Sequence, residues 1–276
     1  MTRCYATLSQ IRTRFGILPT DPTTSDADLL LQLQNASAMI DRHMNMFVFE
    51  PMLETRLFDW RDPSYLVLKP STLLAAPTAA TDSEGNAITA GNLTGITYKM
   101  YPKGPYQALR VKNGASFGTG SARSQAISMT GLFGLHLDYS GAWVVTDAVG
   151  VGGIDNSVTT VPVADSTRFS AGMLISIGTE FMRVTATPTA TTITVRRAEN
   201  GSSPASAIQT APISVYSPMA DIVELTLTVA AWLRTREFTS TDTRGAGNTE
   251  SEAPSNLPDL LCDMACDYKE NFLWQS

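Results

Sequence analysis

Two places in the sequence carry residues that could do acid–base chemistry. Glu180 is the only carboxylate in the apolar stretch FSAGMLISIGTEFMRV, where a buried acid could donate a proton. His136 and Asp138 are two residues apart in GLFGLHLDYSG. In a strand these two side chains would share one face, an arrangement that a hydrolase could use. The residues around each candidate decide between a catalytic and a structural role.

The surroundings of Glu180 favour a structural charge. We expect it to begin a strand after a turn at 178–179, with three arginines near it in sequence or one hairpin away: Arg183, Arg196 and Arg197. A carboxylate beside a guanidinium is ionised and paired, which suits structure more than acid catalysis. No second carboxylate stands at a fixed short spacing to share acid and base roles.

The sequence contains no enzyme motif in the structural context that its chemistry needs. It has no HExxH or Walker pattern, and GASFG around Ser116 has the spacing of GxSxG but lies in the strand-rich region with no predicted helix after it, so we do not expect a nucleophile elbow there. His43 ends a predicted helix, where a cation suits the helix dipole. Cys262 and Cys266 are four residues apart but lack the further ligands that zinc requires. The sequence therefore predicts a protein that is not an enzyme, without catalytic residues, cofactor or bound metal.

Composition indicates a globular protein that does not wrap nucleic acid. The chain has 276 residues, of which 43% are apolar and 17% are charged, and a net charge of −6. Nucleic-acid binding needs clustered lysine and arginine, and no basic run occurs. An acidic chain could still line a passage for DNA, because repulsion prevents sticking. We find no secretion signal and no apolar run of about 20 residues, so we expect synthesis in a cytoplasm and no membrane contact.

The N-terminal part of the sequence predicts two helices. LSQIRTRFGI has apolar residues at helical spacing and ends at Gly16. TTSDADLLLQLQNASAMIDRHMN opens with Ser25 and Asp28 in a capping-box arrangement. Its apolar stripe consists of Leu29, Leu33, Ala36 and Ile40.

The middle of the chain predicts strands. Residues 47–145 contain short aromatic and β-branched runs, with a turn at 84–86. Residues 155–217 form a second β unit of short strands, between a glycine-rich entry and Pro218. Those breaks predict an inserted module that folds as a small β-barrel or sandwich.

The C-terminal part predicts two further helices joined by a linker. SPMADIVELTLTVAAWLRTREF fits both a strand and a helix, and its length favours the helix. Residues 239–256 are polar and linker-like, and Asn256 caps a last helix. Its apolar residues, which we expect to bind a partner or the chain's own core, are Leu260, Leu261, Met264, Tyr268, Phe272 and Trp274.

These elements predict an α+β fold. Its helical core would combine the N-terminal helix pair with the two C-terminal helices, next to the β-rich middle region. The core would comprise residues 1–154 and 218–276, and the inserted small β-barrel or sandwich module would comprise residues 155–217.

Several stretches resemble proteins of the tailed-bacteriophage neck. VPVADSTRFSAGMLISIGTEFMRVTA followed by TTITVRRAENGS looks like a small β-module that recurs in such virion proteins. YLVLKPSTLLAAPTAATDSEGNAIT, YKMYPKGPYQALRV and AISMTGLFGLH look like the head–tail adaptor (connector) family, with Phe133 where that family has Trp. The order of elements is also similar over most of the chain.

The resemblance implies a structural virion protein of the viral neck, made in the bacterial host. Such adaptors form a homo-oligomeric, typically dodecameric ring under the portal protein and contact the stopper or tail-completion protein, with DNA only as passing cargo during ejection. Cyclic rings use head-to-tail interfaces, so each copy needs two different complementary faces. Two alternatives remain open: another neck, tail or baseplate protein such as a stopper or tail-completion protein, and a glycan- or wall-degrading hydrolase that uses His136 and Asp138.

Overall fold

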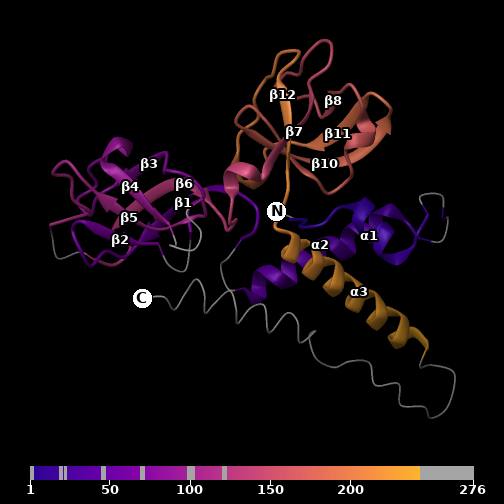
Figure 1. The fold of residues 1–276 in the computed structure, drawn as a ribbon, viewed down its shortest axis with the longest axis horizontal. Helices are drawn as coiled ribbons and strands as arrows, with labels where there is room; N and C mark the ends of the chain where they lie inside the picture. Colours follow the sequence, from indigo (N-terminus) through magenta and orange to yellow (C-terminus); the bar gives the residue numbers. More distant parts are fainter. Residues whose placement is uncertain are drawn as a thin grey trace.

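The computed structural model describes residues 3–18, 21, 24–44, 48–68, 72–97, 103–119 and 123–242, with side chains up to residue 235. Within these residues the chain is mixed α and β and mostly β, with three α-helices and three antiparallel sheets (Figure 1). The expected core of four helices is not confirmed, because the fourth helix falls outside the described residues. No helix in the described part is long and apolar enough to span a bilayer.

The first two helices begin and end where capping chemistry allows. Helix α1 (Leu8–Phe15) opens with a capping box between Thr7 and Gln10 and ends at Gly16, which has a φ of 65°. Helix α2 (Asp26–His43) opens with the Ser25 hydroxyl accepting the Asp28 N–H. The segment that fitted both a strand and a helix is helix α3 (Ala220–Asp242). One apolar cluster joins the helices, including Ile11, Leu29, Leu33, Ile40, Ile222, Leu225 and Val229.

Two three-stranded sheets share a second core. The first sheet has the order β1-β6-β3 and the second has the order β2-β5-β4. The strands are β1 (Met52–Phe58), β2 (Tyr65–Val67), β3 (Ala79–Thr81), β4 (Leu93–Thr97), β5 (Tyr106–Val111) and β6 (Ile127–Phe133), with a short 3-10 helix η1 (Ala90–Asn92). Aromatic side chains fill this core, among them Trp60, Phe117 and Phe133. The turn expected at 84–86 follows β3.

The third sheet has six strands, in the order β7-β12-β9-β10-β11-β8. It curls so that its two edges meet, where the Gly150 N–H donates to the Pro162 carbonyl oxygen at 2.8 Å. Its interior is a third apolar core. The elements are β7 (Trp143–Ala148), β8 (Thr160–Pro162), η3 (Ser166–Arg168), β9 (Leu174–Ile177), β10 (Glu180–Thr189), β11 (Thr192–Arg196), η4 (Glu199–Gly201) and β12 (Pro212–Tyr216). We call residues 143–216 the barrel.

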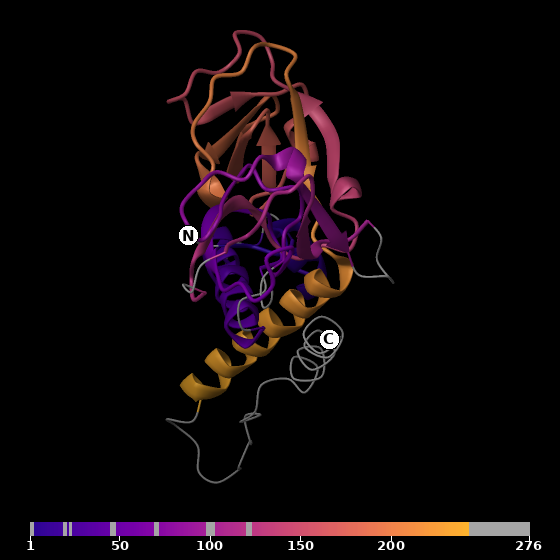
Figure 2. The same ribbon diagram turned by 90° about the vertical axis from the view of Figure 1, so that its left-hand side faces the viewer.

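The barrel begins earlier than the range of 155–217 that the sequence predicted for the module. Its first strand, β7, pairs along its length with β12. The sequence run AWVV that forms β7 has the same β pattern as the region before it, so only this long-range pairing reveals the boundary. The two chain connections to the barrel lie together, because the Ser217 N–H donates to the Ala142 carbonyl oxygen at 2.8 Å. Helix α3 leaves the barrel directly and runs away from it (Figure 2).

Candidate functional site

Glu180 lies buried at the start of β10 and is surrounded by donors. Its carboxylate accepts from Arg197 Nε at 2.7 Å and Nη2 at 2.6 Å, and from the backbone N–H groups of Ala198 at 3.1 Å and Ala205 at 2.7 Å. Burial by itself would raise the pKa of Glu180, but these hydrogen bonds outweigh it and lower the pKa. Glu180 is therefore an ionised and fully hydrogen-bonded charge with no proton to donate.

Arg197 extends this contact into a cross-link between loops. Its guanidinium also donates to the carbonyl oxygens of Asp155 at 2.8 Å, Val158 at 2.7 Å and Ala205 at 2.7 Å. The loop after β7 and the loop before β12 are thus fixed to the start of β10. The sequence predicted that Glu180 pairs with a nearby arginine, and Arg197 is that residue.

His136 and Asp138 do not form a catalytic pair. The expectation that they share a strand face is wrong, because β6 ends at Phe133 and both residues lie in the following loop. His136 Nδ1 accepts the Asp138 backbone N–H at 3.1 Å. The proton of the neutral ring therefore lies on Nε2, which donates to the Ser217 carbonyl oxygen at 3.2 Å. Burial lowers the pKa of His136, and both ring nitrogens are occupied.

The carboxylate of Asp138 accepts hydrogen bonds from its own loop and none from the His136 imidazole. It accepts from the Ser140 hydroxyl at 2.8 Å and from the Gly141 N–H at 3.2 Å, at the start of η2 (Tyr139–Gly141). These two hydrogen bonds lower the pKa of Asp138. Asp138 therefore caps η2, and the loop connects the β6 sheet to the barrel. Its histidine, His136, has no free lone pair to act as a base.

A second buried ion pair joins the barrel to the rest of the chain. Arg183 of β10 donates from Nη1 and Nη2 to the two carboxylate oxygens of Glu50, at 2.8 Å and 2.6 Å. Both side chains are buried. Burial by itself would lower the pKa of Arg183, but the Glu50 charge and hydrogen bonds raise it. Asn200 adds a donor to Glu50 at 3.1 Å, so this carboxylate holds two parts of the barrel.

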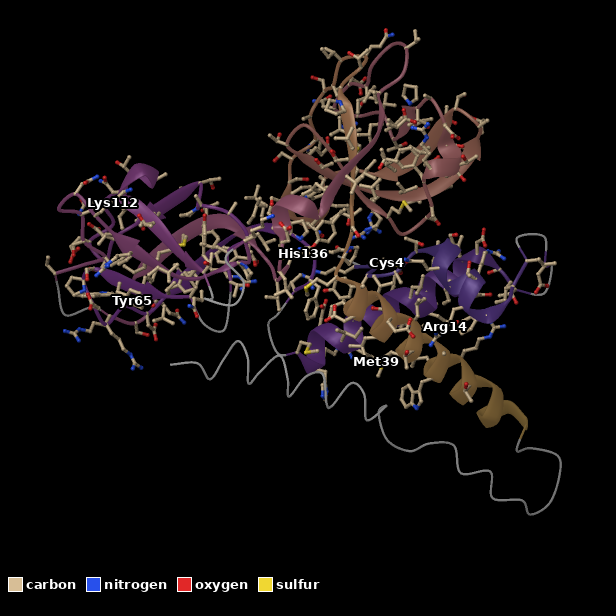
Figure 3. The ribbon with its side chains drawn as sticks, in the orientation of Figure 1. Cys4, Arg14, Met39, Tyr65, Lys112 and His136 are labelled. Carbon is tan, nitrogen blue, oxygen red and sulfur yellow. The ribbon has the colours of Figure 1, made fainter. Side chains whose placement is uncertain are left out.

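Neighbouring groups connect the same junction to the N-terminal segment. Arg183 Nη1 also donates to the carbonyl oxygen of Gly172 at 3.0 Å and contacts that of Cys4 at 3.5 Å. Burial raises the pKa of the Cys4 thiol to about 12, so this cysteine is not a nucleophile at neutral pH. Figure 3 places Cys4 and His136 near the centre of the molecule, where the helices, the two sheets and the barrel meet.

Two tyrosines complete the junction by binding the backbone of Phe49. The Tyr5 hydroxyl donates to Asp41 and accepts the Phe49 N–H, and the Tyr216 hydroxyl donates to the Phe49 carbonyl oxygen at 2.9 Å. Burial raises the pKa of both tyrosines. The contacts join α2, the segment before β1, and the last strand of the barrel. We call Glu50, Arg183, Asn200, Tyr5 and Tyr216 the junction cluster.

The backbone packs closely at this junction. Gly172 has a φ of 97°, and a Cβ atom there would lie 3.2 Å from the Ala6 carbonyl oxygen. Gly201 has a φ of 79°, and a Cβ atom there would lie 1.9 Å from the Leu53 carbonyl oxygen. Only glycine fits at such a contact without moving the backbone. The barrel therefore rests directly on the N-terminal segment and on β1.

Sequence reasoning missed Glu50, whose segment FVFEP predicts only a strand. One signal was present: Glu50 is a single charge inside the apolar run MFVFEPML, much as Glu180 and Arg183 are charges inside an apolar stretch. The described residues contain no group of three or more His, Cys, Asp or Glu side chains that could hold a metal ion. The expected partner-binding residues, Leu260, Leu261, Met264, Tyr268, Phe272 and Trp274, lie outside the described residues.

The buried ion pairs Glu50–Arg183 and Glu180–Arg197 thus act as cross-links between segments that are distant in sequence. Comparison with known proteins adds no relative to this description. No protein-family model matches the chain, and no curated protein or solved structure matches it.

Proposed function

We propose that this chain is a structural virion protein, a head-to-tail adaptor that forms a ring between the portal and the tail-side neck proteins. The observation that carries the proposal is the use of Glu180 and His136. Glu180 receives four hydrogen bonds from Arg197 and two backbone N–H groups, and both His136 nitrogens bind backbone atoms. The two candidates for acid–base chemistry therefore have structural partners in place of a substrate.

The junction cluster supports a structural role. Its buried ion pair between Glu50 and Arg183 fixes the barrel to the segment before β1. A buried pair of this kind adds little net stability compared with apolar packing, and its proposed role here is to specify one arrangement of the groups around it. A protein that transmits contacts from one neck component to the next needs its parts in one fixed arrangement.

Features of the sequence also support the adaptor proposal. The resemblance to head–tail adaptors covers the β-module and the strands before it. The net charge of −6 suits a protein that lines a DNA passage without holding the DNA. The proposed partners are further copies of the chain in a ring, the portal protein, and a stopper or tail-completion protein. The proposed location is the neck of the virion.

Reconstitution tests this proposal. DNA-filled heads that lack necks are incubated with the purified chain, and bound protein is imaged at the portal vertex with a tag on the chain. We expect a ring at the vertex under the portal. Label at the distal end of the neck or on the baseplate would instead indicate a stopper, tail-completion or baseplate protein. Degradation of purified cell wall, abolished by His136→Ala, would indicate a hydrolase.

A further inference from the structure

His136 lies where three parts of the chain meet. It belongs to the loop between β6 and β7, which leads from the first sheet into the barrel. Its ring packs against Tyr216, the last residue of the barrel, with the two ring centroids 5.9 Å apart. It also binds the backbone of Ser217, close to the start of helix α3 at Ala220. Figure 3 shows His136 between the strands, the barrel and α3. One side chain thus connects the loop that enters the barrel to the segment that leaves it.

The two hydrogen bonds of the ring together require a neutral imidazole. Nδ1 accepts the Asp138 N–H at 3.1 Å, and Nε2 donates to the Ser217 carbonyl oxygen at 3.2 Å. In a protonated imidazole both nitrogens are donors, so Nδ1 would face the Asp138 N–H as a second donor. The bond to Ser217 is compatible with a protonated ring, but the bond to Asp138 is not. A protonated ring therefore keeps both contacts in no orientation, and either the ring turns or the Asp138 backbone moves.

The Asp138 backbone is connected to the contact that closes the barrel. Asp138 caps η2, and the next residue after η2 is Ala142. The carbonyl oxygen of Ala142 accepts the Ser217 N–H at 2.8 Å, which holds the two chain connections of the barrel together. A change at the His136 ring therefore reaches this contact from both sides, through Ser217 directly and through η2.

Charged groups on two elements face the His136 ring. On its own loop the Asp138 carboxylate lies 3.7 Å from the Lys103 ammonium, and on α3 Asp221 lies in the first turn. From the barrel only the neutral Tyr216 ring packs against it. The two carboxylates favour a proton on the imidazole, but burial opposes it more strongly, so the pKa of His136 is lowered.

Water can reach the ring although it is largely buried. A hollow of about 470 Å³ lies between the loop and the start of α3, and His136, Ser217 and Asp221 contribute to its lining. Protons can therefore exchange with the imidazole without unfolding of the barrel or the helices.

We infer that His136 is a pH-sensitive latch: its neutral ring holds the loop before the barrel to the segment after it, and protonation releases the Asp138 backbone from the ring. The inference does not depend on the adaptor proposal. The folded-state pKa of His136 lies below its ordinary value of 6.5, so the unfolded chain binds the proton first. The contribution of the latch to stability is therefore complete above about pH 6.5, decreases as the pH falls towards the lower folded-state pKa, and is constant below it.

A nuclear magnetic resonance titration of the ¹⁵N-labelled full chain tests the latch directly. The chain has only two histidines, so His136→Gln assigns the imidazole signals. Between pH 8 and pH 5 we expect the His136 ring to titrate below 6.5, and the Asp138 amide signal to shift with the same midpoint. A His136 ring that titrates at or above 6.5, or an Asp138 amide signal that does not follow it, would overturn the inference.

Melting temperatures give a second, independent readout. We expect the wild type to lose at least about 2 °C more than His136→Gln between pH 7.5 and pH 5.5, because glutamine does not titrate. The matched control is His43→Gln, which replaces the other histidine at the end of α2 and should keep the wild-type difference. Equal pH dependence of the wild type and His136→Gln, or loss of the difference in His43→Gln, would contradict the latch.

Discussion

Glu50 and Arg183 are 133 positions apart in the chain and form a buried, two-pronged ion pair. Glu50 precedes β1, and Arg183 lies in the middle of β10. Among the described residues, this is the only contact between the barrel and the rest of the structure in which two buried side chains share two charge-assisted hydrogen bonds. The pair therefore fixes the position of the barrel relative to the segment before β1.

Replacing one partner of this ion pair should destabilise the protein. We expect Arg183→Met to lower the free energy of unfolding by about 3–5 kcal/mol, because it leaves the Glu50 carboxylate buried without its partner. The double variant Arg183→Met with Glu50→Leu should recover much of that loss, because no unpaired charge remains. Urea denaturation of the wild type, both single variants and the double variant measures the coupling. Additive effects of the two substitutions would show that the pair is not coupled.

Glu180→Gln tests the barrel cross-link. We expect a loss of about 3 kcal/mol, because an amide cannot accept all the donors that now face the carboxylate. The matched control is Glu84→Gln, a surface carboxylate on the turn after β3, which should change stability little. Thermal unfolding followed by circular dichroism compares the variants. Equal stability of Glu180→Gln and the wild type would contradict a structural role for Glu180.

Acidification should reduce the contribution of the Glu180 carboxylate to stability. The folded-state pKa of Glu180 is lowered below its ordinary value of 4.5, so its contribution to stability is complete above pH 4.5 and is lost as the pH falls through the lower folded-state pKa. The difference in stability between the wild type and Glu180→Gln should therefore shrink on acidification. Melting temperatures of both proteins between pH 7 and pH 3 measure this difference, and a constant difference across that range would refute the assignment.

The barrel should be removable as a unit. The Ser217 N–H donates to the Ala142 carbonyl oxygen, so the two ends are already adjacent. We expect a short Gly/Ser linker in place of residues 143–216 to leave the helices folded, with Glu50→Leu added to avoid an unpaired buried charge. Replacing only 155–217 should be worse, because β7 then loses its partner β12. Loss of the helical circular dichroism signal in the first variant would contradict the boundary.

The C-terminal segment should mediate assembly with the head. Its sequence predicts a polar linker followed by an amphipathic helix with six large apolar side chains, and burying each would contribute roughly 1.5–3 kcal/mol. We expect truncation after Asn256 to leave a folded monomer, with an unchanged melting temperature, that fails to join DNA-filled heads. If the helix packs on its own chain instead, the truncated protein melts well below the full-length one without any partner.

The sequence predicted the local elements better than their long-range contacts. Both N-terminal helices follow from caps and apolar spacing at Gly16 and Ser25, and the strand start at Glu180 follows from its turn. The pairing of β7 with β12 and of Glu50 with Arg183 joins segments far apart in sequence, and no periodicity encodes such contacts. The spacing of His136 and Asp138 also fitted a strand, but β6 ends before them, at Phe133.

Native mass spectrometry of the chain alone and mixed with the proposed partner, a portal protein, tests the central claim most directly. We expect weak, concentration-dependent self-association of the chain alone and a ring of many copies on the portal, because the portal would supply part of the interface. A stable dimer with two-fold symmetry in both samples would contradict the adaptor ring.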